Sequence, residues 1–164
     1  MPETFDKKQI HDALVAALEG LVENAKSAMM RAYETATHEE NVAENKYDTL
    51  GLEAAYLTQG QARRLAECEA DLAAFRNISP KQFTGDDAIS IGALVRLEDE
   101  AGDEQYVFLG PAAGGLKISL GDVDIVVITP SAPFGRALLN TCVGDAVAVQ
   151  VAARKQTYEV TAVY

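Results

Sequence analysis

The sequence has little cysteine and no long apolar run. Its 164 residues include two cysteines, Cys68 and Cys142, which lie far apart in the sequence. Their spacing fits neither a disulfide framework nor a metal site, so both are expected to be free thiols in a reducing, cytoplasmic compartment. No apolar run reaches the roughly 18 residues of a membrane span, and the N-terminus lacks the apolar core of a signal peptide. We therefore expect no membrane partner.

Positive charge is also scarce. Fourteen Lys and Arg residues stand against 25 Asp and Glu residues, which gives a formal net charge of -11. Proteins that grip nucleic acid through a general basic surface need many Lys and Arg contacts to phosphate, so the net charge argues against this class. We expect no direct sequence-specific DNA binding, whereas docking onto a basic partner protein stays open.

The first half of the chain has the periodicity of two long helices, at about residues 6–37 and 50–75. Apolar residues recur every three or four positions in both, which predicts one buried stripe on each helix. Both stripes are narrow and neither segment has a proline break. Each stripe is therefore expected to bury against the other in an antiparallel coiled-coil hairpin, rather than against a globular core. The stripes are Ile10, Leu14, Ala17, Leu21, Ala25, Ala28, Ala32 and Ala36, and Leu50, Ala54, Leu57, Gln61, Arg64 or Leu65, Cys68, Leu72 and Phe75.

A domain boundary is expected shortly after the second helix. Pro80 cannot continue a helix, and the residue before a proline is biased away from helical conformation. The next residues are polar and include Gly85. The predicted organisation is a hairpin domain over residues 1–78, a linker over 79–87 and a C-terminal domain over 88–164, which is expected to fold alone from about Thr84.

The C-terminal part changes to the period of two that is typical of strands. Alternating or continuous apolar runs predict strands at residues 89–97, 105–109, 116–119, 124–129, 146–151 and 158–164, with the fourth run central. Residues 111–115 are expected to form a hairpin turn. Residues 131–140 predict a short helix with Pro133 near its start and Asn140 tolerating a left-handed end. The fold class is therefore α+β, with a helical hairpin followed by an antiparallel β domain that has one short helix.

The segment at residues 131–145 resembles the C-terminal signature of the bacterial Gre transcription elongation factors. In that family a Ser-Pro-hydrophobic-Gly-Lys/Arg-Ala-Leu segment precedes a Val-Gly-Asp turn. This chain reads Ser-Ala-Pro-Phe-Gly-Arg-Ala-Leu-Leu-Asn-Thr-Cys-Val-Gly-Asp. Upstream, Glu44-Asn45 with a nearby aromatic residue is similar to the tip of the Gre coiled coil. The resemblance spans nearly the whole chain and implies an FKBP-like C-terminal domain.

The resemblance also implies a role. A Gre-like chain binds RNA polymerase and inserts its hairpin tip through the secondary channel, where acidic residues assist the polymerase-bound magnesium in cutting backtracked RNA. Such a chain is not itself an enzyme, needs no metal or cofactor in isolation, and meets nascent RNA only inside the polymerase complex. The implied docking residues are Pro133, Phe134, Gly135, Arg136 and Leu138.

The tip departs from the Gre pattern, which reads Gly-Asp-hydrophobic-x-Glu-Asn. Here residues 40–45 read Glu-Asn-Val-Ala-Glu-Asn, so Asn41 replaces the aspartate whereas Glu44 keeps its acid. Magnesium prefers oxygen ligands, which makes Glu40 and Glu44 the candidate catalytic acids, with Asp48 nearby in the tip. Asn41-x-x-Glu44 also has the form of a helix capping box. Two functions stay open: stimulation of cleavage, or a non-catalytic regulator that occupies the channel and competes with Gre factors.

Other candidates are weaker. His11 and His38 have no second ligand at metal-binding spacing, so no metal site is expected there. The pairs Lys7-Lys8 and Arg63-Arg64 are expected on solvated helix faces. An FKBP-like fold is a weak basis for prolyl isomerase activity, because a fold does not determine a function.

Overall fold

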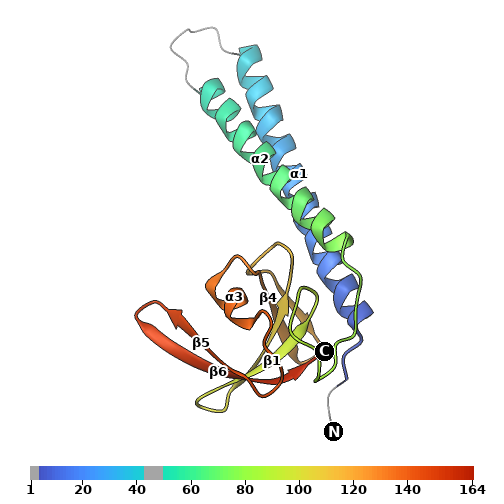
Figure 1. Ribbon diagram of the computed structural model, residues 1–164. Helices are drawn as coiled ribbons and strands as arrows, with labels where there is room; N and C mark the ends of the chain where they lie inside the picture. Colours follow the sequence, from blue (N-terminus) through green and yellow to red (C-terminus); the bar gives the residue numbers. More distant parts are fainter. Residues whose placement is uncertain (1–3, 43–49) are drawn as a thin grey trace. The chain divides into compact units, whose positions relative to one another are not determined.

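The computed structural model describes residues 4–42 and 50–164, without the side chains of residues 38–42, 50–52, 54 and 151. Two long helices, α1 (Lys7–Val42) and α2 (Leu50–Arg76), precede six strands and a short helix, α3 (Pro133–Leu138) (Figure 1). The chain forms two compact units: Val15–Ala73, called here the hairpin unit, and Met1–Leu14 with Ala74–Tyr164, called the sheet unit. Within the described ranges, no helix combines the length and apolar composition of a bilayer span.

Helix α1 begins where Asp6 caps it. The Asp6 carboxylate accepts hydrogen bonds from the backbone N–H groups of Lys8 (3.0 Å) and Gln9 (3.3 Å). These N–H groups have no partner within a helix, so the cap satisfies them. After the last residue of α2, Ile78 N donates to Phe75 O in the turn that closes this helix.

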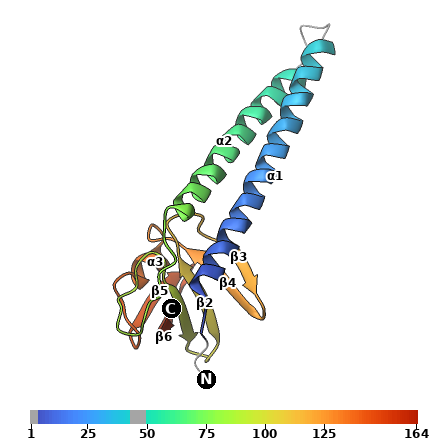
Figure 2. The ribbon, with the colours of Figure 1, turned by 90° about the vertical axis from the view of Figure 1, so that its right-hand side faces the viewer.

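The hairpin unit confirms two long helices that lie side by side (Figure 2). Most of the predicted α1 stripe is buried, but Leu18 and Val22 take the places expected for Ala17 and Leu21. On α2 the expected burial of Leu57 is wrong, since its side chain is 55% exposed. The half-buried Thr58 lies on the inner face instead, in the series 58, 61, 65, 68 and 72. This spacing of three and four residues keeps one face inward.

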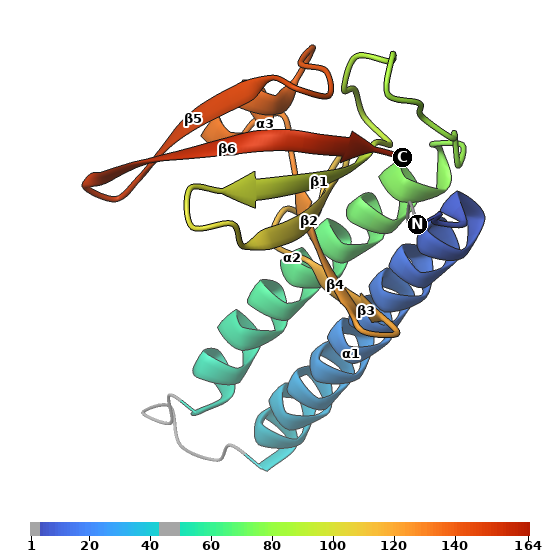
Figure 3. The same cartoon turned by 90° about the horizontal axis from the view of Figure 1, so that it is seen from below.

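The sheet unit contains one six-stranded sheet with the order β3-β4-β2-β1-β6-β5 (Figure 3). The strands are β1 (Leu94–Asp99), β2 (Glu104–Leu109), β3 (Lys117–Leu120), β4 (Val123–Ile128), β5 (Ala146–Val151) and β6 (Arg154–Val163). The expectation of an all-antiparallel sheet is wrong in one place, because β2 and β4 pair in parallel. β3 lies on the far side of β4, so residues 111–115 connect two strands that are not neighbours and do not form the expected hairpin turn.

The first predicted strand is shorter than expected. β1 begins at Leu94, although Ile89 and Ala93 are fully buried and continue the apolar pattern upstream. Ile89 is held by backbone hydrogen bonds to Asn140 and Thr141, outside the sheet ladder. Gly92 and Ala93 bond to Leu109 of β2, but Ile91 is 43% exposed, so the apolar pattern at residues 89–93 does not mark a strand with one buried face.

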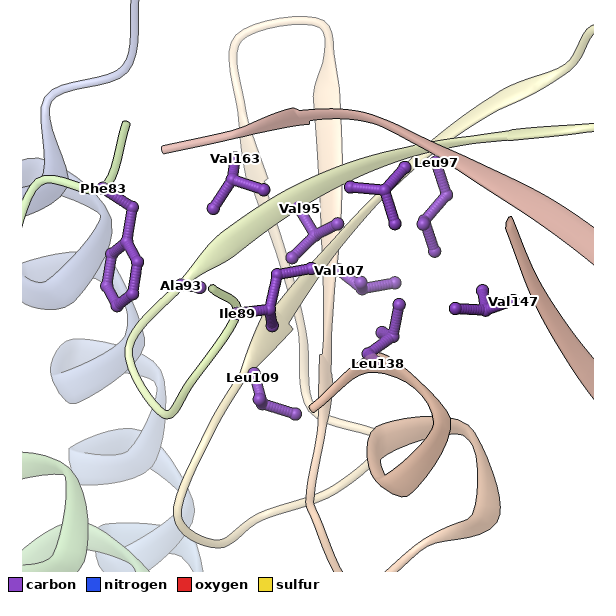
Figure 4. Close-up of a cluster of buried hydrophobic side chains, with 11 residues drawn as sticks. Phe83, Ile89, Ala93, Val95, Leu97, Val107, Leu109, Leu138, Val147 and Val163 are labelled. Carbon is purple, nitrogen blue, oxygen red and sulfur yellow. The ribbon is translucent and has the colours of Figure 1, made fainter. Parts of the chain in front are cut away.

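One face of the sheet packs against α3. Leu138 of α3 points toward Val95 and Val107 of the sheet, and all three side chains are at most 1% exposed (Figure 4). Phe83 belongs to the same core and is 3% exposed, although it lies in the predicted linker. The boundaries at residues 78 and 87 stay a prediction, but part of that linker is core.

The opposite face of the sheet is also buried. Leu94, Phe108 and Val127 are cross-strand neighbours there and are at most 2% exposed. Phe75, from the end of α2, stacks on Phe108 with ring centroids 6.2 Å apart, and Phe5 packs edge-on against Tyr106 at 5.3 Å. A fragment that begins at Thr84 lacks Phe5 and Phe75. The expectation that such a fragment folds alone is therefore not supported by this packing.

Candidate functional site

A concave pocket lies where α3 meets the strands of the sheet unit. It encloses about 560 Å³ and is mainly apolar. Phe134 of α3 and Tyr158 of β6 form part of its wall, with ring centroids 5.2 Å apart. The remaining lining comes from β2, β4 and the turns beside them, at Gln105, Val107, Gly114, Gly115, Val126, Val127, Ile128, Thr129 and Ala132. We call this hollow the α3 pocket.

The local sequence positions Phe134 in the α3 pocket. Pro133 is the first residue of α3, where its missing N–H costs no hydrogen bond. A Cβ atom on Gly135 would lie 1.9 Å from Thr129 O, so only glycine lets the helix approach this backbone. Ala132 N donates to the same Thr129 oxygen at 3.1 Å. Close packing at Gly135 thus sets the ring of Phe134 beside Tyr158.

The predicted docking residues have different surroundings. Pro133 and Arg136 are exposed, whereas Phe134 is half-buried and lines the α3 pocket. Leu138 is 0% exposed, so its side chain holds α3 on the sheet and is not available to a partner. Gly135 is also buried, because α3 packs closely against the backbone of Thr129 at this position.

Tyr158 is a site residue that was predicted from the sequence only as part of a strand. It lines the α3 pocket and also a smaller adjoining hollow of about 210 Å³. Carboxylates dominate that second hollow, with Glu98, Asp99, Glu100 and Glu159 in its lining. The alternation of Tyr158 with the buried Val160 puts both on one face of β6, and this signal could have identified it. The two hollows together offer an apolar recess beside an acidic rim.

The predicted tip residues lie partly outside the described residues. Glu40 and Asn41 fall in the last turns of α1, and their side chains are not described, while Glu44 and Asp48 lie outside the described ranges. The capping box expected from Asn41 to Glu44 depends on residues outside the described ranges and stays a prediction. The metal-assisting role of the acids stays a prediction.

Lys7 contradicts the expectation of a solvated face, since its side chain is 4% exposed. Its ammonium donates to the backbone oxygens of Lys81, Gly92 and Tyr164. It also lies 5.0 Å from the ring centroid of Phe83, a cation–π contact. Burial, together with the nearby Lys81 charge, lowers the pKa of Lys7 to about 8. Lys7 therefore fastens the start of α1 within the sheet unit.

Metal binding has little support in the part of the chain that the structure describes. No three His, Cys, Asp or Glu residues within it lie close enough together to hold an ion. The Nδ1 atom of His11 is buried there without a hydrogen-bond partner, but His11 belongs to no such group of three. Cys68 is buried and Cys142 half-buried, both as free thiols.

Comparison with known proteins identifies the family. The C-terminal domain described as "Transcription elongation factor, GreA/GreB, C-term" matches residues 84–164. Transcription elongation factor GreA of Neorickettsia sennetsu is 30% identical over 149 residues, which cover 89% of this chain and 86% of that protein. GreA of Nitratidesulfovibrio vulgaris is 29% identical, with 93% and 89% covered. The Gfh1 crystal structure from Thermus thermophilus is 20% identical, covers 92% of this chain and 94% of that chain, and has a TM-score of 0.38.

The GreA of Neorickettsia sennetsu is similar along nearly the whole chain, and the family domain coincides with the part that contains the α3 pocket. This chain belongs to the GreA/GreB family of transcription elongation factors.

Proposed function

We propose that this protein binds RNA polymerase through the α3 pocket and its acidic rim, inserts its helical tip through the secondary channel, and stimulates the polymerase's own cleavage of backtracked RNA. The observation that supports this most directly is the α3 pocket, because Phe134 belongs to the segment that resembles the family signature and also lines an apolar recess. The protein is then a cofactor of cleavage and not an enzyme, and its partner places it in the cytoplasm.

The docking chemistry follows from the lining of the two hollows. An apolar side chain of the polymerase that enters the α3 pocket removes Phe134 and Tyr158 from water, which stabilises the complex by roughly 25 cal/mol for each Å² of apolar surface buried. The carboxylates around Tyr158 attract Lys or Arg residues on the same partner segment. A basic and apolar segment of the polymerase therefore fits this surface.

The chemistry at the tip depends on Glu44, with Glu40 and Asp48 as neighbouring acids. A magnesium ion shared with the polymerase would activate a water and stabilise the scissile phosphate. Carboxylate oxygens suit such a hard cation, and a few acids on a tip form a ligand set only when the polymerase supplies the remainder. Glu44 would contribute an oxygen ligand or hold the attacking water. RNA is met only inside the complex.

Asn41 supports a second function. It stands where the Gre pattern has an aspartate, so one of the two expected acids is absent. A chain that docks but lacks enough carboxylate ligands would occupy the secondary channel without stimulating cleavage and would compete with Gre factors. The proposed cleavage role requires Glu40 or Asp48 to compensate for Asn41.

A binding assay tests the docking step. Full-length protein with Phe134→Ala, which removes the ring, or Ala132→Gln, which fills the pocket with a polar chain, should bind core RNA polymerase at least tenfold more weakly. Ile91→Ala removes an exposed apolar side chain outside the pocket and should bind like wild type. Thermal melts establish that each variant is folded. Equal affinity for all four proteins would show that the polymerase is not bound through this pocket.

A further inference from the structure

Strand β5 forms an open edge of the sheet. It is the last strand in the order β3-β4-β2-β1-β6-β5, and its register is with β6 alone. Among the described residues, no backbone hydrogen bond joins β5 to anything beyond β6 and the turn that precedes it. An edge strand presents a row of N–H and C=O groups that another strand can pair with.

The register shows which groups of β5 face outward. Val160 N donates to Asp145 O, so Asp145 bonds toward β6. Hydrogen-bonded and non-hydrogen-bonded pairs alternate along antiparallel strands, and Val147 and Val149 therefore also bond toward β6. The N–H and C=O groups of Ala146, Ala148 and Gln150 then point away from the sheet. Three consecutive outward positions are enough for a short ladder.

The two edges of the sheet differ in their protection. At the opposite edge, β3 has four residues and carries the exposed Lys117, and short length and lysine both discourage strand addition. β5 has six residues, Ala-Val-Ala-Val-Gln-Val, with neither charge nor proline. The exposed side chains of Ala146 and Ala148 are also small. Nothing in the sequence of β5 opposes the approach of another strand.

The charges at the two ends of β5 indicate which partner strand fits this edge. Asp145 precedes its first residue, whereas Arg154 pairs with Val151 at its far end, so the strand has an acidic end and a basic end. When two copies of β5 pair antiparallel, Asp145 of one copy comes two strand spacings, about 10 Å between Cα atoms, from Arg154 of the other. Their side chains can meet, and the two-fold axis creates the contact twice. The edge is therefore complementary to itself.

We propose that two copies of this chain associate through antiparallel pairing of their β5 strands, with the two-fold axis near Ala148. The interface is isologous, main-chain hydrogen bonds supply its ladder, and the opposite charges at the strand ends fix its direction. It uses the β5 edge and not the α3 pocket, and of the edge positions only Ala146 also lines the acidic hollow. The pairing therefore does not depend on the proposed polymerase docking.

Sedimentation equilibrium of the full chain tests this proposal. Each copy carries a net charge of -11, so two copies repel each other at low salt. The measurement should therefore be made near 0.15 M salt, where the Debye length is about 8 Å and long-range repulsion is screened. Wild type should shift from monomer to dimer as its concentration rises. Ala148→Lys places two ammonium groups opposite each other at the axis and should weaken association at least tenfold. Ala66→Lys makes the same change of charge on an exposed position of α2 and should associate like wild type.

Hydrogen exchange gives a second readout that needs no variant. The amide protons of Ala146, Ala148 and Gln150 should exchange more slowly as the wild-type concentration rises, whereas that of Ser119 on the other edge should not change. A protein that stays monomeric at every concentration, with unchanged exchange at these amides, would overturn the proposal. Equal weakening by Ala148→Lys and Ala66→Lys would also overturn it.

Discussion

The two units of this protein bury very different side chains. The sheet unit holds large residues in complete burial, with Leu94, Leu97, Leu109 and Ile125 all at 0% exposure. In the hairpin unit, the described side chains of α1 that are buried beyond Val22 belong to Ala25, Ala32 and Ala36. Several of its larger side chains are exposed instead, at 50% for Met30, 56% for Tyr33 and 64% for Tyr56.

The difference in buried side chains implies a difference in stability between the two units. Apolar burial stabilises in proportion to area, so the sheet unit gains far more per residue than the alanine seam does. A seam of small side chains lets two helices approach closely, which keeps the pair narrow. Local opening of the hairpin unit at its alanine seam, beyond Val22, should therefore cost less free energy than unfolding of the sheet unit. A closely packed pair of helices suits the proposed entry of the hairpin into a channel.

The strongest test of the comparison is one substitution made in both units. Leu97→Ala removes a fully buried side chain from the sheet unit and should lower the free energy of unfolding by about 3 kcal/mol. Leu57→Ala removes a side chain that is 55% exposed and should change it by less than about 0.5 kcal/mol. Urea titration measures both. Similar losses at the two positions would mean that the hairpin seam is assigned to the wrong face.

Gly135→Ala should show how strictly the α3 pocket depends on backbone packing. The added Cβ would lie 1.9 Å from Thr129 O, and a backbone oxygen cannot move aside as a flexible side chain does. We expect a loss of about 2–3 kcal/mol, measured by thermal or urea unfolding. Gly60→Ala is the matched control in α2, because nothing lies within 4 Å of its added Cβ. Alanine favours helix, so that variant should gain up to about 1 kcal/mol.

Lys7 predicts a pH dependence of stability in the sheet unit. Its pKa is about 8 in the folded protein, below the ordinary 10.5. Between these values the unfolded chain binds more protons, so stability should rise with pH from about 8 to 10.5. The gain should be on the order of 2 kcal/mol relative to Lys7→Met, which cannot titrate. Unfolding free energies of both proteins at several pH values give this difference, and a difference that stays constant with pH would contradict the buried ammonium.

The smallest expected effect lies in the β5–β6 turn. Ala152 has a φ of 56°, a left-handed conformation that disfavours residues with a Cβ atom. Ala152→Gly should therefore stabilise the protein by about 0.5–1 kcal/mol, despite the larger entropy of glycine in the unfolded chain. A calorimetric melting temperature that falls instead would show that the turn does not hold this conformation.

The sequence predicted the elements better than their partners. Residues 146–151 form a strand with the predicted bounds, and Asn140 has the expected left-handed φ of 66°. Both predictions depend on local sequence. The strand follows from the alternation of small or polar residues with valine, and the left-handed φ follows from the tolerance of asparagine for that conformation. The parallel pairing of β2 with β4 was missed, because alternation is the same for either direction of a neighbouring strand.

The burial of Lys7 and the exposure of Leu57 could not be predicted from local sequence. The backbone oxygens that bind Lys7 come from residues 81, 92 and 164, which no local pattern around residue 7 indicates. Leu57 is adjacent to Thr58, and a stripe with spacings of three and four can be continued through either residue. The more apolar one was expected inside, whereas helix geometry puts Thr58 there. Phe134 was expected at the docking site, and packing at Gly135 explains how its ring comes to line the pocket.

The most direct test of the proposed function is the rate of transcript shortening in a stalled, backtracked RNA polymerase complex, measured across a magnesium titration. Wild type should accelerate shortening. Glu44→Gln keeps the shape of the side chain and removes its charge, so it should bind the polymerase normally and stimulate less. Asn41→Asp adds the carboxylate of the Gre pattern and should stimulate more. Equal stimulation by wild type and Glu44→Gln would contradict the role of the acid. No stimulation by any of the three, with binding intact, would contradict the cleavage function and favour the channel-occupying regulator.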